Sequence, residues 1–230
     1  LNDVKVKVED TKQVTSSDLM KYVQQKQNTE ILGFWKLQLH IYNTASLDTT
    51  KWTSRNAHKI GEAPVIFSKE MANSSCIQLR KAMNNKGYFQ AEVDTTMTVK
   101  DRKVNLEYSI VARDPYYIGQ YVANFSHPEL QSIANNPRYT LIKTNTRFDS
   151  DLLNQERQRV ASAMRRRGYF YFDAEYLRFT ADSTRLKNNI DVQMDFQDFV
   201  HTLSQEDKDK LFRKYSISQV HFHIDYDPSL

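Results

Sequence analysis

The fold is decided by a stretch that occurs twice, first as Leu79-Arg80-Lys81-Ala82-Met83-Asn84-Asn85-Lys86-Gly87-Tyr88-Phe89 and later as Val160-Ala161-Ser162-Ala163-Met164-Arg165-Arg166-Arg167-Gly168-Tyr169-Phe170. Both copies contain Ala-Met-x-x-x-Gly-Tyr-Phe. Apolar residues before each glycine recur at helical spacing, and the glycine comes where that spacing stops. The pattern predicts two helices, each capped by a left-handed glycine, with the tyrosine or the phenylalanine beyond it packing back onto the last turn.

Each repeated helix has a capping signal before it and alternating residues after it. Ser68 precedes the first helix, and Asp149 or Ser150 precedes the second. Alternation of apolar and polar residues after each glycine predicts a β-hairpin with one apolar face. The alternating stretches are 91–99 and 104–110 in the first copy, and 172–176 and 190–196 in the second.

Each copy also opens with a strand and a shorter helix. Residues 4–8 alternate, and Thr15 to Asp18 is typical of a capping box at the start of a helix over 19–25. In the second copy, 117–122 predicts the strand and His127-Pro128 the start of the helix. Each unit is therefore strand, helix, helix, strand, strand. The expected fold class is α+β, with a three-stranded mixed sheet covered on one face by two helices.

The repeat also predicts the domain boundaries. The first module is expected at 1–114, with an insertion at about 27–67, and the second at 115–199. Within the insertion we favour a helix, although the alternation of Trp35, Leu37 and Leu39 also suits a strand. Residues 200–214 are expected to be a linker. Because Tyr215-Ser216-Ile217 echoes Tyr116-Tyr117-Ile118, 215–230 is expected to be the first strand of a truncated third module.

Composition limits the function classes. The 230 residues are 40% hydrophobic and carry a formal net charge of +4, with charges of both signs interspersed along the chain. A single cysteine, Cys76, excludes an internal disulfide framework and a zinc site built from cysteines. No apolar run approaches the roughly 18 residues that span a bilayer, so we expect a soluble fragment.

The repeated features resemble POTRA domains, the polypeptide-transport-associated modules of the Omp85 superfamily, whose units run β-α-α-β-β and end their second helix in Gly-Tyr-Phe. The insertion, with Ile31-Leu32-Gly33 early and Ile60-Gly61-Glu62-Ala63-Pro64-Val65 late, looks like TamA-like or BamA-like proteins, and most like the TamL-type lipoproteins of Bacteroidota. In such proteins a lipid-anchoring cysteine precedes the modules and a C-terminal outer-membrane barrel follows them. The resemblance therefore implies a place on the periplasmic face of the bacterial outer membrane.

Candidate reactive residues give no catalytic or metal-binding pattern. The histidines have no partnering motif for nucleophilic catalysis, so we expect no enzyme activity. His221-x-His223 lacks a third ligand at a supporting spacing, so we expect neither a metal nor a cofactor. Cys76 lies on the apolar stripe of its helix, where a cysteine acts as a small buried hydrophobe.

Open sheet edges are the candidate site. Unpaired backbone groups on such an edge recruit extended segments, and by resemblance the second strand of each module, about 91–99 and 171–180, is an edge. We therefore predict a scaffold for outer-membrane protein assembly or translocation that binds unfolded barrel precursors and periplasmic or lipoprotein accessory subunits. The expected binding residues are Ala91, Glu92, Val93, Asp94, Thr95, Thr96, Tyr171, Asp173, Glu175 and Leu177.

Two alternatives remain open at this point. One is a static interaction module that holds a TamB-like or lipoprotein partner through the insertion. The other is a basic nucleic-acid-binding module, which rests on the net positive charge; Arg165-Arg166-Arg167 beside two aromatic residues is the stretch that invites it. We disfavour nucleic acid as a partner because those arginines fall in the last helical turn, where cations complement the helix dipole.

Overall fold

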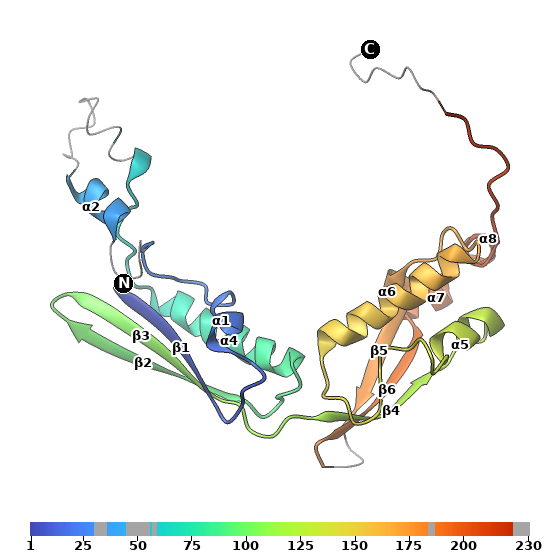
Figure 1. Cartoon of the computed structure of the whole chain (residues 1–230), viewed down its shortest axis with the longest axis horizontal. Helices are drawn as coiled ribbons and strands as arrows, with labels where there is room; N and C mark the ends of the chain where they lie inside the picture. The colour runs from blue at the N-terminus through green and yellow to red at the C-terminus, as the bar shows by residue number, and fades with distance from the viewer. Residues whose placement is uncertain (30–35, 45–55, 57–58, 184–186, 223–230) are drawn as a thin grey trace. The chain divides into compact units, whose positions relative to one another are not determined.

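The computed structural model describes residues 1–29, 36–44, 56, 59–183 and 187–222. The chain divides into two compact units, unit 1 (Leu1–Tyr116) and unit 2 (Tyr117–Leu230). Each unit has its own three-stranded sheet and its own apolar core. The fold class predicted from the sequence is confirmed: the protein is α+β, in two units that share one strand order (Figure 1).

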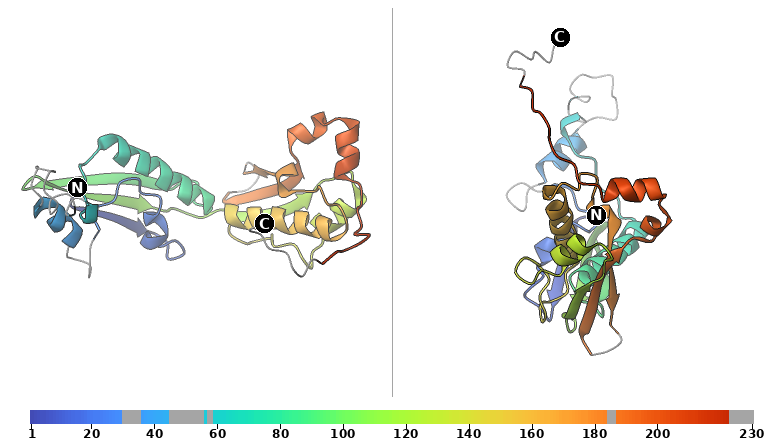
Figure 2. Two further views of the ribbon diagram at one scale, coloured as in Figure 1. Left: turned by 90° about the horizontal axis from the view of Figure 1, so that it is seen from above. Right: turned by 90° about the vertical axis from the view of Figure 1, so that its right-hand side faces the viewer.

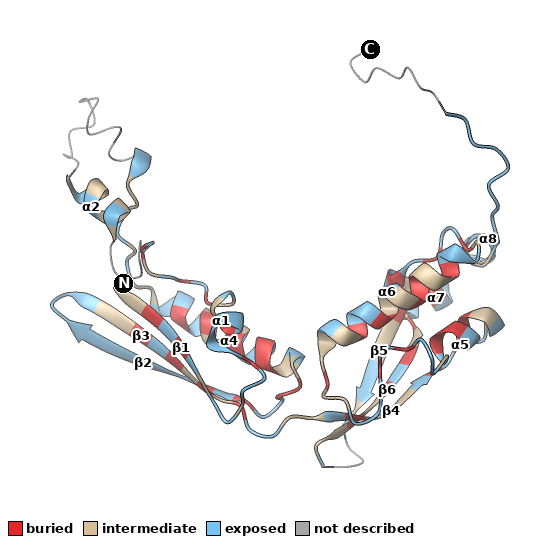
Figure 3. Ribbon diagram, viewed as in Figure 1, coloured by how far each residue is buried: buried red, intermediate tan, exposed pale blue. Residues whose placement is uncertain are grey.

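Unit 1 is built on a sheet with the order β1-β3-β2, in which β3 pairs in parallel with β1 and antiparallel with β2. Helices α1 and α4 cover one face of this sheet (Figures 1 and 2). The buried side chains of the unit 1 core include Leu19, Leu79 and Tyr108, and Figure 3 shows buried residues along α4 and the sheet that it covers. The described elements are β1 (Asp3–Glu9), α1 (Ser16–Met20), α2 (Leu37–Thr44), α4 (Lys69–Asn85), β2 (Glu92–Lys100) and β3 (Lys103–Val111).

Helix α1 starts as predicted and ends early. Thr15 accepts a hydrogen bond from the Asp18 backbone N–H, and the Asp18 carboxylate accepts one from the Thr15 backbone, so the capping box is confirmed. The helix ends at Met20 and does not reach residue 25 as predicted. The reason is tertiary: Gln24 N–H donates to Ser75 Oγ at 3.0 Å, which ties this segment to α4 instead of to another helical turn.

Two amide side chains fasten the ends of the insertion to each other. Gln25 donates to the Ile66 carbonyl and accepts from Ser68 N–H at 3.0 Å. Asn28, only 2% exposed, donates to the Ala63 carbonyl at 2.7 Å and accepts from the backbone N–H of residue 65 at 3.1 Å. The helix favoured within the insertion is found as α2, whereas much of the remaining predicted segment lies outside the described residues.

Both glycine caps are confirmed. Gly87 has φ 86° and Gly168 has φ 98°, the left-handed region that favours glycine. In each cap the glycine N–H bonds three residues back and the following tyrosine N–H bonds five residues back, which satisfies the last helical carbonyls. The tyrosine is the residue that packs back in each copy: Tyr88 and Tyr169 are buried, whereas Phe89 and Phe170 are 39% and 67% exposed.

Unit 2 repeats the plan with the sheet order β4-β6-β5, again with one parallel and one antiparallel pair. Its long helix α6 is capped by Asp149, and its short helix α5 begins after His127, both as predicted. The described elements are β4 (Tyr117–Ala123), α5 (Pro128–Ala134), α6 (Ser150–Arg166), a 3-10 turn η1 (Ala174–Tyr176), β5 (Leu177–Asp182), β6 (Asn189–Phe196), α7 (Asp198–Thr202) and α8 (Gln205–Leu211).

The prediction of a linker over 200–214 is wrong for its first part. Helices α7 and α8 follow β6 and place Val200 and Leu211, 3% and 2% exposed, in the core of unit 2. Phe212 also stacks on His127, with ring centroids 4.7 Å apart. Of the strand expected over 215–230, residues 215–222 are described and carry no strand, and the rest lies outside the described residues.

A buried carboxylate holds unit 2 together between α5 and α6. Glu156, 0% exposed, accepts from Thr140 Oγ1 at 2.8 Å and from Leu141 N–H at 3.0 Å. Arg159 Nε and Nη2 donate to it at 2.8 and 2.7 Å, and Nη2 also reaches the Ile133 carbonyl at 3.1 Å. One side chain therefore fixes the loop after α5 onto α6. The sequence reasoning missed it, because a glutamate inside a charged helix gives no signal of burial.

Candidate protein-interaction edges

Strand β2 forms a long edge of the unit 1 sheet. The two-residue turn at Asp101 and Arg102, both at positive φ, makes Lys100 and Lys103 the closing pair of the hairpin. The carbonyl of residue 104 accepts from the Asn2 N–H. The backbone N–H and C=O groups of the even-numbered residues of β3 therefore point toward β1, and those of the odd-numbered residues point toward β2. The backbone groups of four β2 residues therefore point outward, away from the described strands: Val93, Thr95, Met97 and Val99.

The side chains of those four residues lie on the face of the sheet that carries the helices. Val93 is buried at 8% exposure, and Thr95 Oγ1 lies 2.8 Å from Cys76 Sγ on α4. Beyond this contact the apolar face is open, because Met97 and Val99 are 50% and 60% exposed. An added strand at this edge would gain both backbone pairing and apolar contact.

The residues predicted to bind at the start of β2, 91–96, differ in burial and in the face of the sheet on which they lie. Ala91 is buried just before the strand. Glu92 points to the opposite face, where its carboxylate pairs with Arg113 at 3.0 Å. Asp94 and Thr96 are exposed and take part in the pairing with β3. The predicted set over 91–96 therefore lies along one edge, but only its odd-numbered strand residues turn their backbone groups outward.

Strand β5, the corresponding edge of unit 2, is shorter and partly covered. It spans six residues against nine in β2. Gln197 N–H donates to the Tyr176 carbonyl, so the outward backbone groups belong to Leu177, Phe179 and Ala181. Arg157 Nη1 on α6 donates to the Leu177 carbonyl at 3.2 Å. Charged groups that cover an edge in this way reduce its pairing capacity.

The predicted edge residues before β5 do not lie on a strand. Tyr171 belongs to a turn, and Asp173 caps the turn η1 and pairs with Arg165 at 2.9 Å. Glu175 lies within η1, and Leu177 begins β5 with its side chain fully buried. The strand expected over 171–176 is therefore wrong. The local reason is the aspartate cap, which accepts from the Glu175 N–H at 3.0 Å and closes a turn.

The first strand of each unit is also an edge, and in unit 1 it is blocked. The Val4 N–H donates to Gln27 Oε1 at 2.9 Å, which occupies the outer side of β1 near its start. Lys5 and Lys7 alternate along the strand and pair with Asp3 and Glu9. Lysines and side-chain covers of this kind discourage edge pairing. Strand β2 is thus the more accessible edge of unit 1.

The glycine corners bind the chain that leaves each unit. Tyr116 N–H donates to the Gly87 carbonyl at 2.8 Å, and its ring meets Phe89 edge-on at 5.2 Å. In unit 2, Tyr215 N–H donates to the Gly168 carbonyl at 2.7 Å, and its ring meets Phe170 at 6.4 Å. We call this arrangement the exit contact. The exposed phenylalanines thus have a packing role that the sequence reasoning missed, although the repeated tyrosine was its signal.

The comparison with protein families identifies unit 1. The family model described as POTRA, surface antigen variable number repeat, matches residues 4–113. Unit 1 is a POTRA domain. Unit 2 has the equivalent strand order, with a short and a long helix between its first two strands as in unit 1, so the tandem POTRA fold predicted from the sequence is confirmed. The narrower likeness to the lipoproteins of Bacteroidota stays a prediction.

Solved structures similar to this chain include POTRA domains of BamA and N-terminal or periplasmic regions of Omp85 proteins. POTRA3-5 of BamA from Haemophilus influenzae is 13% identical, with a TM-score of 0.44, over 84% of this chain and 64% of that one. The N-terminal domain of Omp85 from Thermosynechococcus elongatus is 9% identical, with a TM-score of 0.35, over 84% and 62%. POTRA1-2 of the periplasmic domain of Omp85 from Anabaena is 9% identical, with a TM-score of 0.35, over 86% and 94%.

These likenesses concern the fold alone. The chain spans less than two thirds of the first two of these structures. No curated protein matches the sequence. Within the described ranges, no helix combines the length and apolarity needed to cross a bilayer, and no cluster of three or more histidine, cysteine, aspartate or glutamate side chains could hold a metal ion.

Proposed function

We propose that this tandem POTRA chain is a periplasmic scaffold of an outer-membrane protein assembly or translocation factor, and that it binds extended client segments by adding them to β2. The observation that carries the proposal is the edge of β2, with four residues whose backbone groups point outward beside an open apolar face. Backbone pairing depends on extended conformation more than on side chains, so such an edge accepts many client sequences.

The binding edge is proposed to be β2 and not β5. An added strand gains hydrogen bonds in proportion to the outward groups it meets, and Arg157 already occupies one of these on β5. Of the residues predicted from the sequence to bind a client strand, Val93 and Thr95 are retained in the proposal. Met97 and Val99 are added because their backbone groups also point outward. Unfolded barrel precursors are the proposed clients, and accessory subunits the proposed further partners.

The exit contact supports a third module in the parent protein. Tyr215 binds the glycine corner of unit 2 as Tyr116 binds that of unit 1, and Tyr116 directly precedes β4. By the same relation we propose that the chain after Tyr215 opens a further POTRA unit. A lipid anchor before this chain and a membrane barrel after it belong to the same proposal.

The test is a titration of the labelled chain with a peptide from a transmembrane β-strand, followed by NMR. We expect shifts at the amides of Val93, Thr95, Met97 and Val99. Met97→Pro removes an outward N–H without breaking the ladder, and should weaken binding about tenfold or more. The matched variant Ala181→Pro removes an outward N–H from β5 and should leave the affinity unchanged. Equal losses, or shifts confined to other surfaces, would refute the β2 site.

The static interaction module remains the rival. It predicts that a partner crosslinks to the insertion at 27–67 and that strand peptides leave the β2 amides unshifted. The fastening of the insertion by Gln25 and Asn28 makes it an integral part of unit 1 and hence a credible docking element. Crosslinks confined to 27–67, together with a silent β2 edge, would favour this rival.

A further inference from the structure

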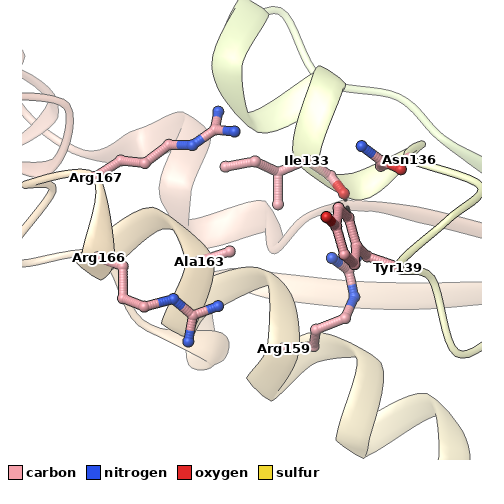
Figure 4. A pocket seen from close by; sticks show the side chains of 7 residues that line it. All are labelled: Ile133, Asn136, Tyr139, Arg159, Ala163, Arg166 and Arg167. Atoms are coloured by element: carbon pink, nitrogen blue, oxygen red, sulfur yellow. Dashed lines mark hydrogen bonds between the residues drawn. The ribbon is translucent and has the colours of Figure 1, made fainter.

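Unit 2 contains a pocket of about 370 Å³ between α5, α6 and the loop that joins them (Figure 4). Ile133 and Ala163 supply an apolar floor, and Tyr139, 59% exposed, forms one wall. The remaining lining residues are Asn136 and the arginines 159, 166 and 167. No carboxylate is among the residues that line it.

The arginines of the pocket differ in how their charges are balanced. Arg159 is bound in a two-pronged manner by Glu156, so this pair adds no net charge. Arg166 and Arg167 make no ion pair with any residue in the part of the chain that the structure describes. Arg138 adds a further cation, since its guanidinium lies over the Tyr139 ring at 5.7 Å. The pocket therefore has an excess of positive charge.

The neighbouring carboxylate does not neutralise this excess. The pKa of Glu129 is lowered by hydrogen bonds from the Tyr169 hydroxyl and from Lys214, and to a smaller extent by Arg167. Its oxygens are thus already engaged, with Lys214 Nζ at 2.9 Å. Arg167 interacts with the Glu129 carboxylate only through the electrostatic field and forms no hydrogen bond with it. The N–H groups of the Arg167 guanidinium therefore stay available to a ligand.

The walls are held in place before any ligand binds. Glu156 fixes Arg159 from one side and the loop from the other, through Thr140 and Leu141. The Asn136 carbonyl accepts from the Tyr139 N–H at 3.1 Å, which sets the start of the same loop. A ligand would therefore meet a preformed site and would order few side chains on binding.

The helix end alone does not account for the arginines. Cations in a last helical turn complement its dipole, which is the ordinary role of such a triplet. The last carbonyls of α6, however, are satisfied by the Gly168 and Tyr169 N–H groups, and Arg165 of the triplet turns away to Asp173. Arg166 and Arg167 instead line a concave surface with an apolar floor.

We propose that this pocket binds an acidic peptide segment of a partner protein, with an apolar side chain on Ile133 and Ala163 and flanking carboxylates on Arg166 and Arg167. Guanidinium groups bind carboxylates through paired hydrogen bonds, and the floor suits an aliphatic or aromatic side chain. A nucleic acid would need a basic track along its backbone, whereas the basic residues here gather around a single pocket of residue size. The site is separate from the β2 edge, so the two can be tested apart.

The test titrates the labelled chain with the peptide acetyl-Glu-Phe-Glu-amide at low salt and follows the amides by NMR. We expect shifts in 133–139 and 159–167 that are lost with acetyl-Gln-Phe-Gln-amide, which lacks charge, and reduced with acetyl-Glu-Ala-Glu-amide, which lacks the ring. The double variant R166Q/R167Q should weaken binding about tenfold or more. Both side chains are exposed at the surface, so the variant should fold.

The matched control is R165Q, which removes a charge from the same helical turn but outside the pocket, and should change the affinity little. Equal weakening by R165Q and the double variant would reduce the effect to general charge and overturn the site. So would equal binding of the uncharged peptide. Tighter binding of a single-stranded oligonucleotide, or of inorganic phosphate, at the same amides would replace the peptide with a phosphate-bearing ligand.

Discussion

The two units follow one plan but fasten the connection between their helices in opposite ways. Unit 1 has a long insertion, and uncharged amides of Gln25 and Asn28 pair with its returning backbone. Unit 2 has a short loop, and its backbone and side chains converge on the single charge of Glu156. The long connection returns to lie beside its own start, where amide side chains reach its backbone, whereas the short loop is tied to α6 through the several lone pairs of one carboxylate. The same fold therefore tolerates two different fastenings.

The largest expected effect tests that contrast directly. Glu156→Ala removes four hydrogen bonds and leaves Arg159 half-buried without its partner, so unit 2 should lose about 3 kcal/mol or more. Gln25→Ala removes two neutral hydrogen bonds and should cost unit 1 about 1 to 2 kcal/mol. Hydrogen exchange at core amides of each unit measures the two values separately. Losses of equal size would show that the two fastenings are equivalent.

The second prediction concerns the glycine corners. A Cβ at a left-handed position costs about 1 to 2 kcal/mol, so Gly87→Ala and Gly168→Ala should each destabilise their own unit by that amount. The larger loss is expected for Gly168, because an added Cβ would lie 3.0 Å from the Tyr215 carbonyl oxygen and disturb the exit contact. Thermal unfolding measures both. Asparagine, which tolerates this conformation, should restore part of the stability at Gly87; unchanged melting of both alanine variants would contradict the caps.

The smallest expected effect is a difference between the two units in how their stability depends on pH. Burial, with a contribution from Lys214, lowers the pKa of His127 below its ordinary value of 6.5, against an opposing effect of Glu129. A lowered histidine pKa means that the unfolded chain binds the proton more readily, so unit 2 should lose stability as the pH falls below 6.5. Protonation of Nδ1 would also end its acceptance from the Leu130 N–H.

In unit 1 the cap of the short helix α1 includes an acidic group, the Asp18 carboxylate, where unit 2 has the basic His127. The Thr15 hydroxyl and backbone N–H lower the pKa of Asp18 below 3.8, so that contribution is present at neutral pH and is lost only as the pH falls through the lowered value. Unfolding of each unit between pH 7 and 5 should therefore show a decline in unit 2 that the Asp18 cap does not produce in unit 1. His127→Asn keeps a capping acceptor and should abolish the decline; a decline that persists in this variant would assign it to another group.

Particular residues mark how far sequence reasoning reached. The glycine caps, Ser68, Asp149 and the capping box at Thr15 were predictable because each acts on backbone groups within a few residues. The strand expected over 171–176 failed at Asp173, whose side chain closes a turn although the flanking residues alternate. An alternation of apolar and polar residues indicates which side chains are buried, but not the backbone conformation. A 3-10 turn packed against a core can bury the same side chains as a strand.

The candidate edge was predictable in part. The sequence placed an edge over 91–99, and the structure has β2 there. Which of its residues turn their backbone outward depends on the register set by the turn at 101–102, and the cover on β5 depends on Arg157 from α6. Neither follows from the local pattern, because both involve partners brought together only by folding.

The sequence by itself determined the repeat, the order of the strands and of the two main helices in each unit, and the caps at which those helices begin and at which the two long ones end. Those features depend on side-chain periodicity and on short-range hydrogen bonds, which the chain carries locally. The tertiary structure alone decided the packing of α7 and α8, the burial of Glu156 and the arginine-lined pocket that it supports. Each of these requires residues distant in the chain to meet, and a hydrophobic pattern specifies that a face is buried without specifying what buries it.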